Sequence, residues 1–190
     1  LVDSAKDSTG AVTVRDKWYA PKQAEFSESE TGKSLEWTIR GTVMNGGRLH
    51  ITFSNRIDLS VMTNSMYLET GIYCDAATAA DLPQTVRLYD INGRFIEAAF
   101  PSIGLNTRSK IRLALSDFGK NDSFAYDRIT SLRFMLPEVL SGEGAITVGS
   151  TVRNGWFHIY TDSMRIARGN AAELSLLRQG SAVVLSAVTN

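Results

Sequence analysis

Apolar and polar side chains alternate with a period of two along most of this chain. In "SLEWTIRG" (34–41), Leu35, Trp37 and Ile39 fall on one side of an extended chain, and the polar residues between them fall on the other. This alternation is typical of a β-strand with one buried face. It recurs in short runs rich in β-branched and aromatic residues. The predicted strands cover residues 11–15, 34–41, 48–53, 57–63, 65–74, 85–90, 94–100, 110–118, 129–136, 145–152, 156–161, 164–168, 173–178 and 182–188.

The links between these runs have the composition of tight turns. "DINGR" (90–94) and "MNGGR" (44–48) contain Asn-Gly, whose residues tolerate the positive φ that a two-residue hairpin turn requires. The first of these predicts a hairpin between residues 85–90 and 94–100. Helix signals are scarce: "DAATAADLP" (75–83) favours one helical turn, and "RGNAAELSLLR" (168–178) has some helical propensity, although Gly169-Asn170 favours a turn before a strand equally.

About a dozen short strands with little helix predict an all-β protein, an antiparallel sandwich or barrel. We expect residues 1–153 to form one β-sandwich. Residues 154–190 have shorter strands, more arginine and an apolar end, so they either supply the final strands or form a small β-annex. The chain begins at Leu1, and we expect it to be a piece of a longer protein or a mature form without its leader.

The composition narrows the function classes. The 190 residues include 20 Lys and Arg and 20 Asp and Glu, so the chain has no excess positive charge with which to bind nucleic acid or an anionic membrane surface. No apolar run approaches the ~18 residues that a membrane span needs. We therefore expect neither nucleic acid nor membrane as a partner.

Alternation also places a set of tyrosines and charged residues on the outward face of the predicted strands. If these strands lie in one sheet, that face carries Tyr67, Glu69, Tyr73, Arg87, Tyr89, Arg112 and Arg133. Ordinary cross-strand pairing would explain such a set. A sugar-binding surface would explain it as well, because sugar rings stack on aromatic rings and arginine grips the carboxylates or sulfates of acidic glycans.

The sequence contains few residue patterns that are typical of catalysis or metal binding. The single cysteine, Cys74, cannot form an internal disulfide, and its position at the end of a strand predicts a small, half-buried residue. Neither His50 nor His158 is identified by its surroundings as a base for a catalytic thiol. No metal, phosphate-loop or nucleophile-elbow motif is present. Two carboxylates that meet in space could still form a glycosidase site, so the enzyme question stays open.

Two segments resemble jelly-roll carbohydrate-binding modules over residues 30–150. "SETGKSLEWTIRG" resembles their early strand, and "LALSDFGKNDSFAYDRITSLRFMLPEVLSGEGAITVGS" resembles their closing half, in which a Pro–Gly link leads to a final strand. The N-terminal domain of chondroitin-sulfate lyases is the nearest likeness. The matching positions are Ser34, Leu35, Trp37, Ile129, Leu132, Phe134, Pro137, Gly144, Ile146 and Val148.

The resemblance implies a jelly-roll β-sandwich whose matched residues pack the core, and it suggests a sugar ligand. Such modules often carry an Asp after the last strand that serves a structural calcium, whereas this chain has Gly149. We therefore expect no cofactor. Asp117, Asp122 and Asp127 could otherwise help bind calcium, although a solvated turn is the simpler interpretation.

The leading hypothesis is a non-catalytic polysaccharide-binding domain of a larger extracellular or cell-surface lyase or hydrolase, with the seven outward residues as its site. The alternative is a structural or receptor-binding domain of a phage tailspike or tail fibre, located on the virion tail and assembled as a homotrimer. A third hypothesis makes the fragment itself a glycan lyase or hydrolase.

Overall fold

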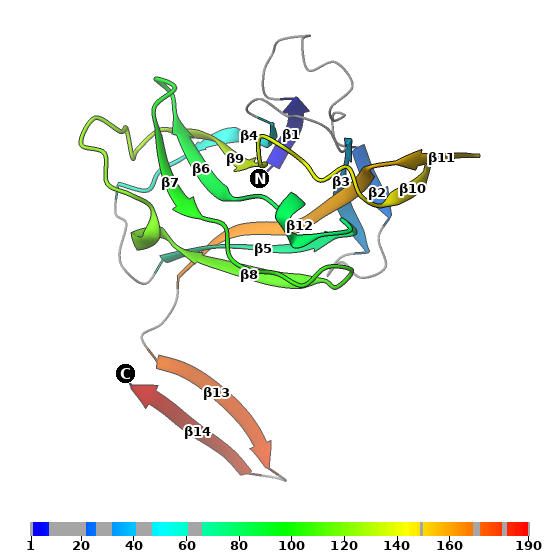
Figure 1. Cartoon of the computed structure of the whole chain (residues 1–190). Coiled ribbons are helices and arrows are strands. Elements are labelled where there is room, and N and C mark those ends of the chain that lie inside the picture. Colours follow the sequence, from blue (N-terminus) through cyan, green and yellow to red (C-terminus); the bar gives the residue numbers. More distant parts are fainter. Residues whose placement is uncertain are drawn as a thin grey trace.

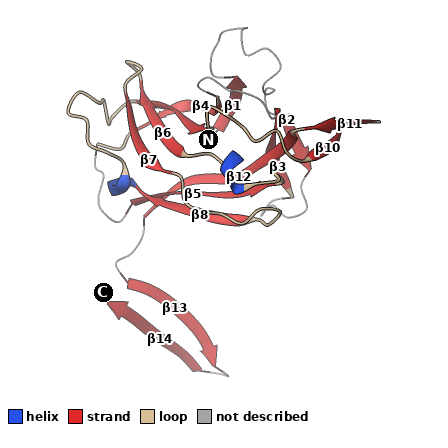
Figure 2. Cartoon of the chain, in the orientation of Figure 1, coloured by secondary structure: helices blue, strands red, loops and turns tan. Residues whose placement is uncertain are grey.

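The structure is a computed structural model. It describes residues 2–7, 22–25, 32–40, 47–60, 66–148, 150–168, 172–179 and 182–189. Most of these residues lie in antiparallel strands, and the two helices among them are single 3₁₀ turns at Ala79–Asp81 and Leu115–Asp117 (Figure 2). The prediction of an all-β chain with one helical turn within residues 75–83 is confirmed. The predicted strand 11–15 and most of the predicted turn 44–48 lie outside the described residues.

Two five-stranded sheets stack face to face as a β-sandwich of jelly-roll type (Figure 1). Sheet I has the order β1 (Val2–Asp7), β4 (Arg48–Ile57), β9 (Ile129–Met135), β6 (Thr85–Asp90) and β7 (Phe95–Ala99). Sheet II has the order β2 (Lys22–Glu25), β3 (Lys33–Arg40), β12 (Trp156–Arg168), β5 (Met66–Cys74) and β8 (Ser109–Ala114).

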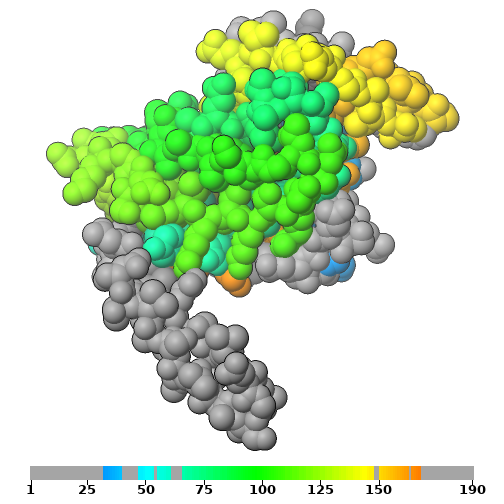
Figure 3. Space-filling view, turned by 60° about the horizontal axis from the view of Figure 1, so that its bottom comes forward, coloured from blue at the N-terminus to red at the C-terminus, as the bar shows by residue number. Residues whose placement is uncertain are grey.

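Two short hairpins accompany the sandwich. β10 (Ala145–Val148) pairs with β11 (Thr151–Asn154), and β13 (Ala172–Gln179) pairs with β14 (Ala182–Thr189). The expectation that residues 145–148 form the last sandwich strand is wrong, because β10 belongs to a separate two-stranded sheet. Val148 pairs with Thr151, so the run 145–152 forms two strands that are two residues apart in the chain, the spacing of a tight hairpin. This hairpin stands at the edge of the molecule in Figures 1 and 3.

Strand β12 unites two predicted strands, 156–161 and 164–168, across a β-bulge. Asp162 pairs with Gly71 and Arg165 with Glu69, so Ser163 and Met164 together oppose one residue of β5. A bulge shifts the phase of the alternation by one residue, which is why the pattern reads as two strands. β12 lies within residues 154–190, the segment expected to supply the final strands or a small β-annex, and it occupies the centre of sheet II.

The inward side chains of both sheets form one apolar core. Trp37, Phe134 and Phe157 are completely or almost completely buried in it, together with the inward residues of β4 and β6. The core positions of Trp37, Leu132, Phe134, Leu136 and Ile146 are confirmed. The side chain of Val148 and all of Gly149 lie outside the described residues.

Asp90 organises the confirmed hairpin between β6 and β7. Its buried carboxylate accepts hydrogen bonds from the backbone N–H groups of Asn92 and Arg94, at 2.8 Å each, and of Ala125, at 2.9 Å. Gly93 supplies the positive φ of the turn, +76°. Burial opposes ionisation of Asp90, but these donors outweigh it and hold the pKa of the carboxyl below its usual value.

We predict that Asp90→Asn lowers the free energy of unfolding at neutral pH by about 1–3 kcal/mol, because an amide cannot accept all three bonds. Because the pKa of Asp90 is lower in the folded than in the unfolded state, its ionised carboxylate stabilises the fold at pH values above the unfolded-state pKa. This stabilisation is lost as the pH falls through the folded-state pKa. Urea unfolding between pH 2 and pH 7 should therefore show a smaller loss of stability below about pH 4 in the variant. Asp122→Asn, at an exposed position, is the control, and equal effects of the two would contradict this role.

Cys74 is fully buried rather than half-buried, on the inward side of β5. Burial raises the pKa of its thiol to about 12, so almost no reactive thiolate forms at neutral pH. We predict that the folded protein does not react with a disulfide reagent such as dithionitrobenzoate, and that one thiol per chain reacts after unfolding in urea. Rapid reaction of the native protein would contradict this placement.

Candidate functional site

The seven residues predicted to share one face lie on two opposite faces of the sandwich. Tyr67, Glu69 and Tyr73 are on β5 and Arg112 is on β8, in sheet II. The other three, Arg87, Tyr89 and Arg133, are on β6 and β9 of sheet I. The premise that these strands form one sheet is wrong. Alternation assigns a residue to a side of its own strand, but it does not tell which sheet the strand joins.

On sheet I, the predicted residues pack against one another. The guanidinium of Arg133 lies 3.8 Å from the ring centroid of Tyr89, and that of Arg87 lies 4.4 Å from the ring centroid of Phe95. Arg87 also makes an ion pair with Glu97. Tyr89 is only 8% exposed, so its ring offers little surface on which a sugar could stack.

On sheet II, aromatic side chains gather along the outer side of the central strands. Trp156, His158 and Tyr160 alternate with buried residues along β12, and Tyr73 stands directly opposite Tyr160 on β5. The rings of Tyr73 and Tyr160 meet edge to face with centroids 5.9 Å apart, and His158 lies 5.7 Å from Tyr160. We call these four residues the aromatic strip.

Neighbouring groups fix the orientation of His158 and the protonation state of Tyr160. The Nδ1 atom of His158 lies 2.9 Å from Oδ2 of Asp75, and the backbone N–H of His158 donates to the same carboxylate. This pair fixes the orientation of the imidazole. Burial raises the pKa of the Tyr160 hydroxyl, and the nearby carboxylate of Glu36 raises it further. Tyr160 therefore keeps its proton at physiological pH and donates its hydrogen bond to Glu36.

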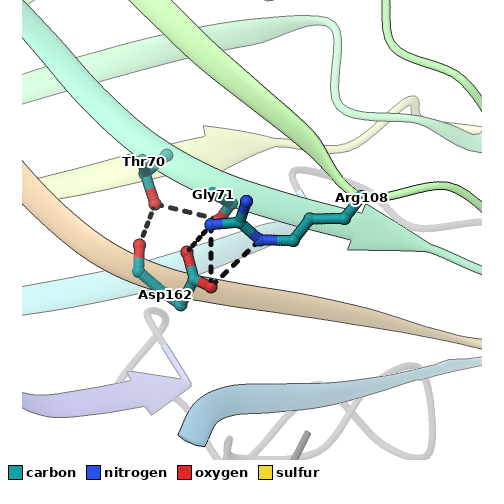
Figure 4. Close-up of polar contacts among 4 residues, drawn as sticks. All are labelled: Thr70, Gly71, Arg108 and Asp162. Carbon is teal, nitrogen blue, oxygen red and sulfur yellow. Dashed lines mark hydrogen bonds and ion pairs between the residues drawn. The ribbon is translucent and has the colours of Figure 1, made fainter. Parts of the chain in front are cut away.

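Next to the strip, side chains that include Tyr73, Arg108, Tyr160 and Asp162 gather around Gly71 and leave no space for a water molecule between them. Arg108 approaches both carboxylate oxygens of Asp162 at 3.2–3.3 Å, directly over Gly71 (Figure 4). A Cβ atom at Gly71 would lie 1.9 Å from Oδ1 of Asp162. The ion pair can occupy this place only because residue 71 has no side chain.

Thr70 forms a hydrogen bond with the backbone of β12 at its bulge, from the side of the sheet that faces the core. Its hydroxyl donates to the backbone carbonyl of Asp162 at 2.5 Å, and the residue is almost completely buried (Figure 4). The bond satisfies a carbonyl that the irregular pairing would otherwise leave without a donor. Thr70 therefore fixes the backbone from which Asp162 projects toward Arg108.

Beyond Gly71, Glu69 sits between two arginines. Its two carboxylate oxygens lie 3.0 Å from Nε of Arg112 and 3.0 Å from Nε of Arg165. Arg112 also covers the ring of Tyr67, 4.0 Å from the centroid. Glu69 points outward as alternation predicts, but the two arginines bury it to 6% exposure. This row is a cross-strand ion network that ties β12, β5 and β8 together.

The sequence prediction missed Trp156, His158, Tyr160, Arg108 and Asp162. The signal for the first three was present, since "WFHIYT" alternates as strictly as the other strands. The pattern does not show, however, that this strand from the tail of the chain pairs with β5. Arg108 precedes β8 and Asp162 precedes a bulge, so period-two alternation could not bring these two together.

The sequence matches no protein-family model, and no curated protein matches it. The fold is similar to that of a family 30 carbohydrate-binding module, with a TM-score of 0.58, 16% identity, and coverage of 96% of this chain and 86% of the other. The family 30 carbohydrate-binding module of a cellulosomal cellulase of Clostridium thermocellum gives a TM-score of 0.54 at 17% identity, over 82% of this chain and 84% of the module.

A third similar structure is a β-1,2-glucanase from Parabacteroides distasonis, with a TM-score of 0.55 and 13% identity. The match covers 98% of this chain and 27% of that enzyme. At such identities the likeness shows the fold, the β-sandwich that carbohydrate-binding modules also have. The narrower resemblance to chondroitin-sulfate lyases stays a prediction.

Two further observations concern the described part of the chain. It contains no helix with the length and apolar character that a bilayer span needs. It also contains no group of three or more His, Cys, Asp or Glu side chains placed to hold a metal ion.

We predict that Gly71→Ala destabilises the fold by about 1–3 kcal/mol, because Asp162 is buried and can make room only by leaving Arg108. Thermal unfolding measures the loss. Gly104→Ala is the matched control, since a Cβ atom there meets Thr107 at an ordinary 3.6 Å. Equal melting temperatures for the two variants would show that the Arg108–Asp162 pair is not constrained by Gly71.

Proposed function

We propose that this chain is a non-catalytic carbohydrate-binding domain that serves a larger polysaccharide-acting protein outside the cell or at its surface. The observation that carries the proposal is the aromatic strip on the outer face of sheet II, beside the Arg108–Asp162 pair over Gly71. The similarity of the sandwich to carbohydrate-binding modules supports it.

The strip combines the two kinds of contact that a sugar needs. Aromatic rings offer apolar surface against which the C–H groups of a pyranose can pack. The Tyr160 hydroxyl, the His158 imidazole and the Arg108–Asp162 pair supply donors and acceptors beside that surface. These groups are already oriented by neighbours, so little side-chain entropy is lost when a ligand binds.

The shape of the site suits a polymer better than an enclosed small molecule. The side chains around Gly71 leave no space for even a water molecule, whereas a pocket that surrounds a small ligand measures ~300–1,000 Å³. The strip and the Arg108–Asp162 pair lie on or beside neighbouring strands of one sheet, so together they form a surface rather than a pocket. A polysaccharide could lie across this face and contact the strip with several sugar units.

The arrangement of carboxylates supports a binding role rather than hydrolysis. A glycosidase needs a protonated carboxylic acid and a second carboxylate on either side of the scissile bond. On this face Glu69 is held by two arginines, and Asp162 is held by Arg108. Asp75 is engaged by His158. These contacts engage all three carboxylates, and Glu36, which also lies on this face, is engaged by the Tyr160 hydroxyl.

The proposal predicts that the chain binds a polysaccharide and that Tyr73→Ala and Tyr160→Ala each weaken binding at least tenfold. Loss of a central aromatic contact costs more than about 1.4 kcal/mol, which is a factor of ten. Affinity gel electrophoresis over a panel of neutral and acidic polysaccharides, followed by calorimetric titration of the best ligand, measures the effect.

Val139→Ala is the control, because Val139 is an exposed apolar residue outside both five-stranded sheets. It should bind as the unaltered chain does. The proposal fails if no polysaccharide binds, or if Val139→Ala weakens binding as much as Tyr160→Ala does. Melting temperatures of all variants show whether each one is folded.

A further inference from the structure

The outer face of sheet I places two arginines directly beside each other. Arg87 on β6 and Arg133 on β9 are cross-strand partners, so both side chains leave the same face. Like charges in this relation destabilise a sheet unless a counter-charge lies close by. Glu97 on β7 supplies one for Arg87, with which it makes an ion pair. No carboxylate within the described ranges makes an ion pair with Arg133.

Arg133 also has an unsatisfied donor. Its Nε atom is buried and has no hydrogen-bond partner in the part of the chain that the structure describes. A buried N–H group without an acceptor destabilises a folded protein, and a bound ion or water molecule can supply the acceptor.

Arg133 differs from Arg112, which stacks on a tyrosine in a similar way but has a carboxylate beside it. Arg112 lies over the ring of Tyr67 at 4.0 Å in much the same way as Arg133 lies over the ring of Tyr89 at 3.8 Å. Arg112, however, has the carboxylate of Glu69 at 3.0 Å, and that carboxylate is shared with Arg165. The two stacks have similar geometry, but only the one on sheet II contains its own anion.

The two guanidinium groups of sheet I rest on adjoining aromatic rings. Arg87 lies over Phe95 at 4.4 Å, and the rings of Phe95 and Tyr89 contact each other with centroids 5.4 Å apart. Stacking fixes the planes of both guanidinium groups before a ligand arrives. A planar guanidinium with fixed N–H groups matches the oxygen atoms of a sulfate or carboxylate better than it matches a neutral hydroxyl.

We propose that Arg133, with Arg87 beside it, forms an oxyanion site on the outer face of sheet I, which takes a sulfate or carboxylate group. The anion offsets the repulsion between the two arginines and gives the buried Nε of Arg133 an acceptor. The site is separate from the aromatic strip, which lies on the opposite face of the sandwich.

The test is calorimetric titration of the full chain with dextran sulfate, with unsulfated dextran as the neutral comparison. Dextran sulfate should bind, and Arg133→Gln should weaken its binding at least tenfold. Arg133→Lys keeps the positive charge but lacks the planar guanidinium group, and it should also weaken binding. If Arg133→Gln does not fold, the affinity of Arg133→Lys tests the proposal instead. Arg128→Gln removes an exposed arginine that pairs with Asp127 elsewhere, and it should change the affinity less than twofold.

Competition by inorganic sulfate, against chloride at equal ionic strength, distinguishes the source of the anion. Displacement shows that the site takes the free ion, and no displacement shows that it takes the group only on a polymer; both agree with the proposal. The proposal is overturned if dextran sulfate does not bind, or if Arg128→Gln weakens binding as much as Arg133→Gln. It is also overturned if only Tyr160→Ala reduces binding of dextran sulfate, a result that would leave the function proposed for sheet II intact.

Discussion

Strand β12 holds sheet II together, because it pairs with β3 along one side and with β5 along the other. Those two strands have no direct pairing, so without β12 the sheet would separate into β2–β3 and β5–β8. The inward side chains of β12, among them Phe157 and Ile159, also pack into the core. One strand thus supplies both the hydrogen bonds that join the sheet and part of the apolar surface that joins the sheet to its neighbour.

The outer side of the same strand carries most of the candidate site. Because strand residues alternate between faces, the burial of Phe157 and Ile159 forces His158 and Tyr160 outward. The bulge at Ser163–Met164 then resets the alternation, so that Arg165 faces outward with Asp162 although an odd number of positions separates them. The packing that stabilises the sheet therefore also fixes the order of aromatic and charged groups along its outer face.

The sequence was sufficient for the fold class, for most strands and for the inward residues, since each depends on local alternation. Trp37, Leu132 and Phe134 are buried as their patterns indicate. It was not sufficient for the outer faces, because Tyr73 and Tyr89 show the same pattern and yet lie in different sheets. The pairing of Asp162 with Arg108 depends on a bulge and on a glycine without a side chain, and neither feature has a period that a pattern could reveal.

The position of β12 in the chain has a consequence for how the protein folds. Trp156 pairs with Arg40, so a strand made late in synthesis joins one made early, and six of the ten sandwich strands lie between them in the chain. Such distant pairing costs loop-closure entropy and slows folding. On the ribosome, β3 and β5 emerge long before the strand that completes their pairing, and their unpaired edges stay open to other chains until then. Assembly of the sandwich is therefore tied to the completion of residues 156–168.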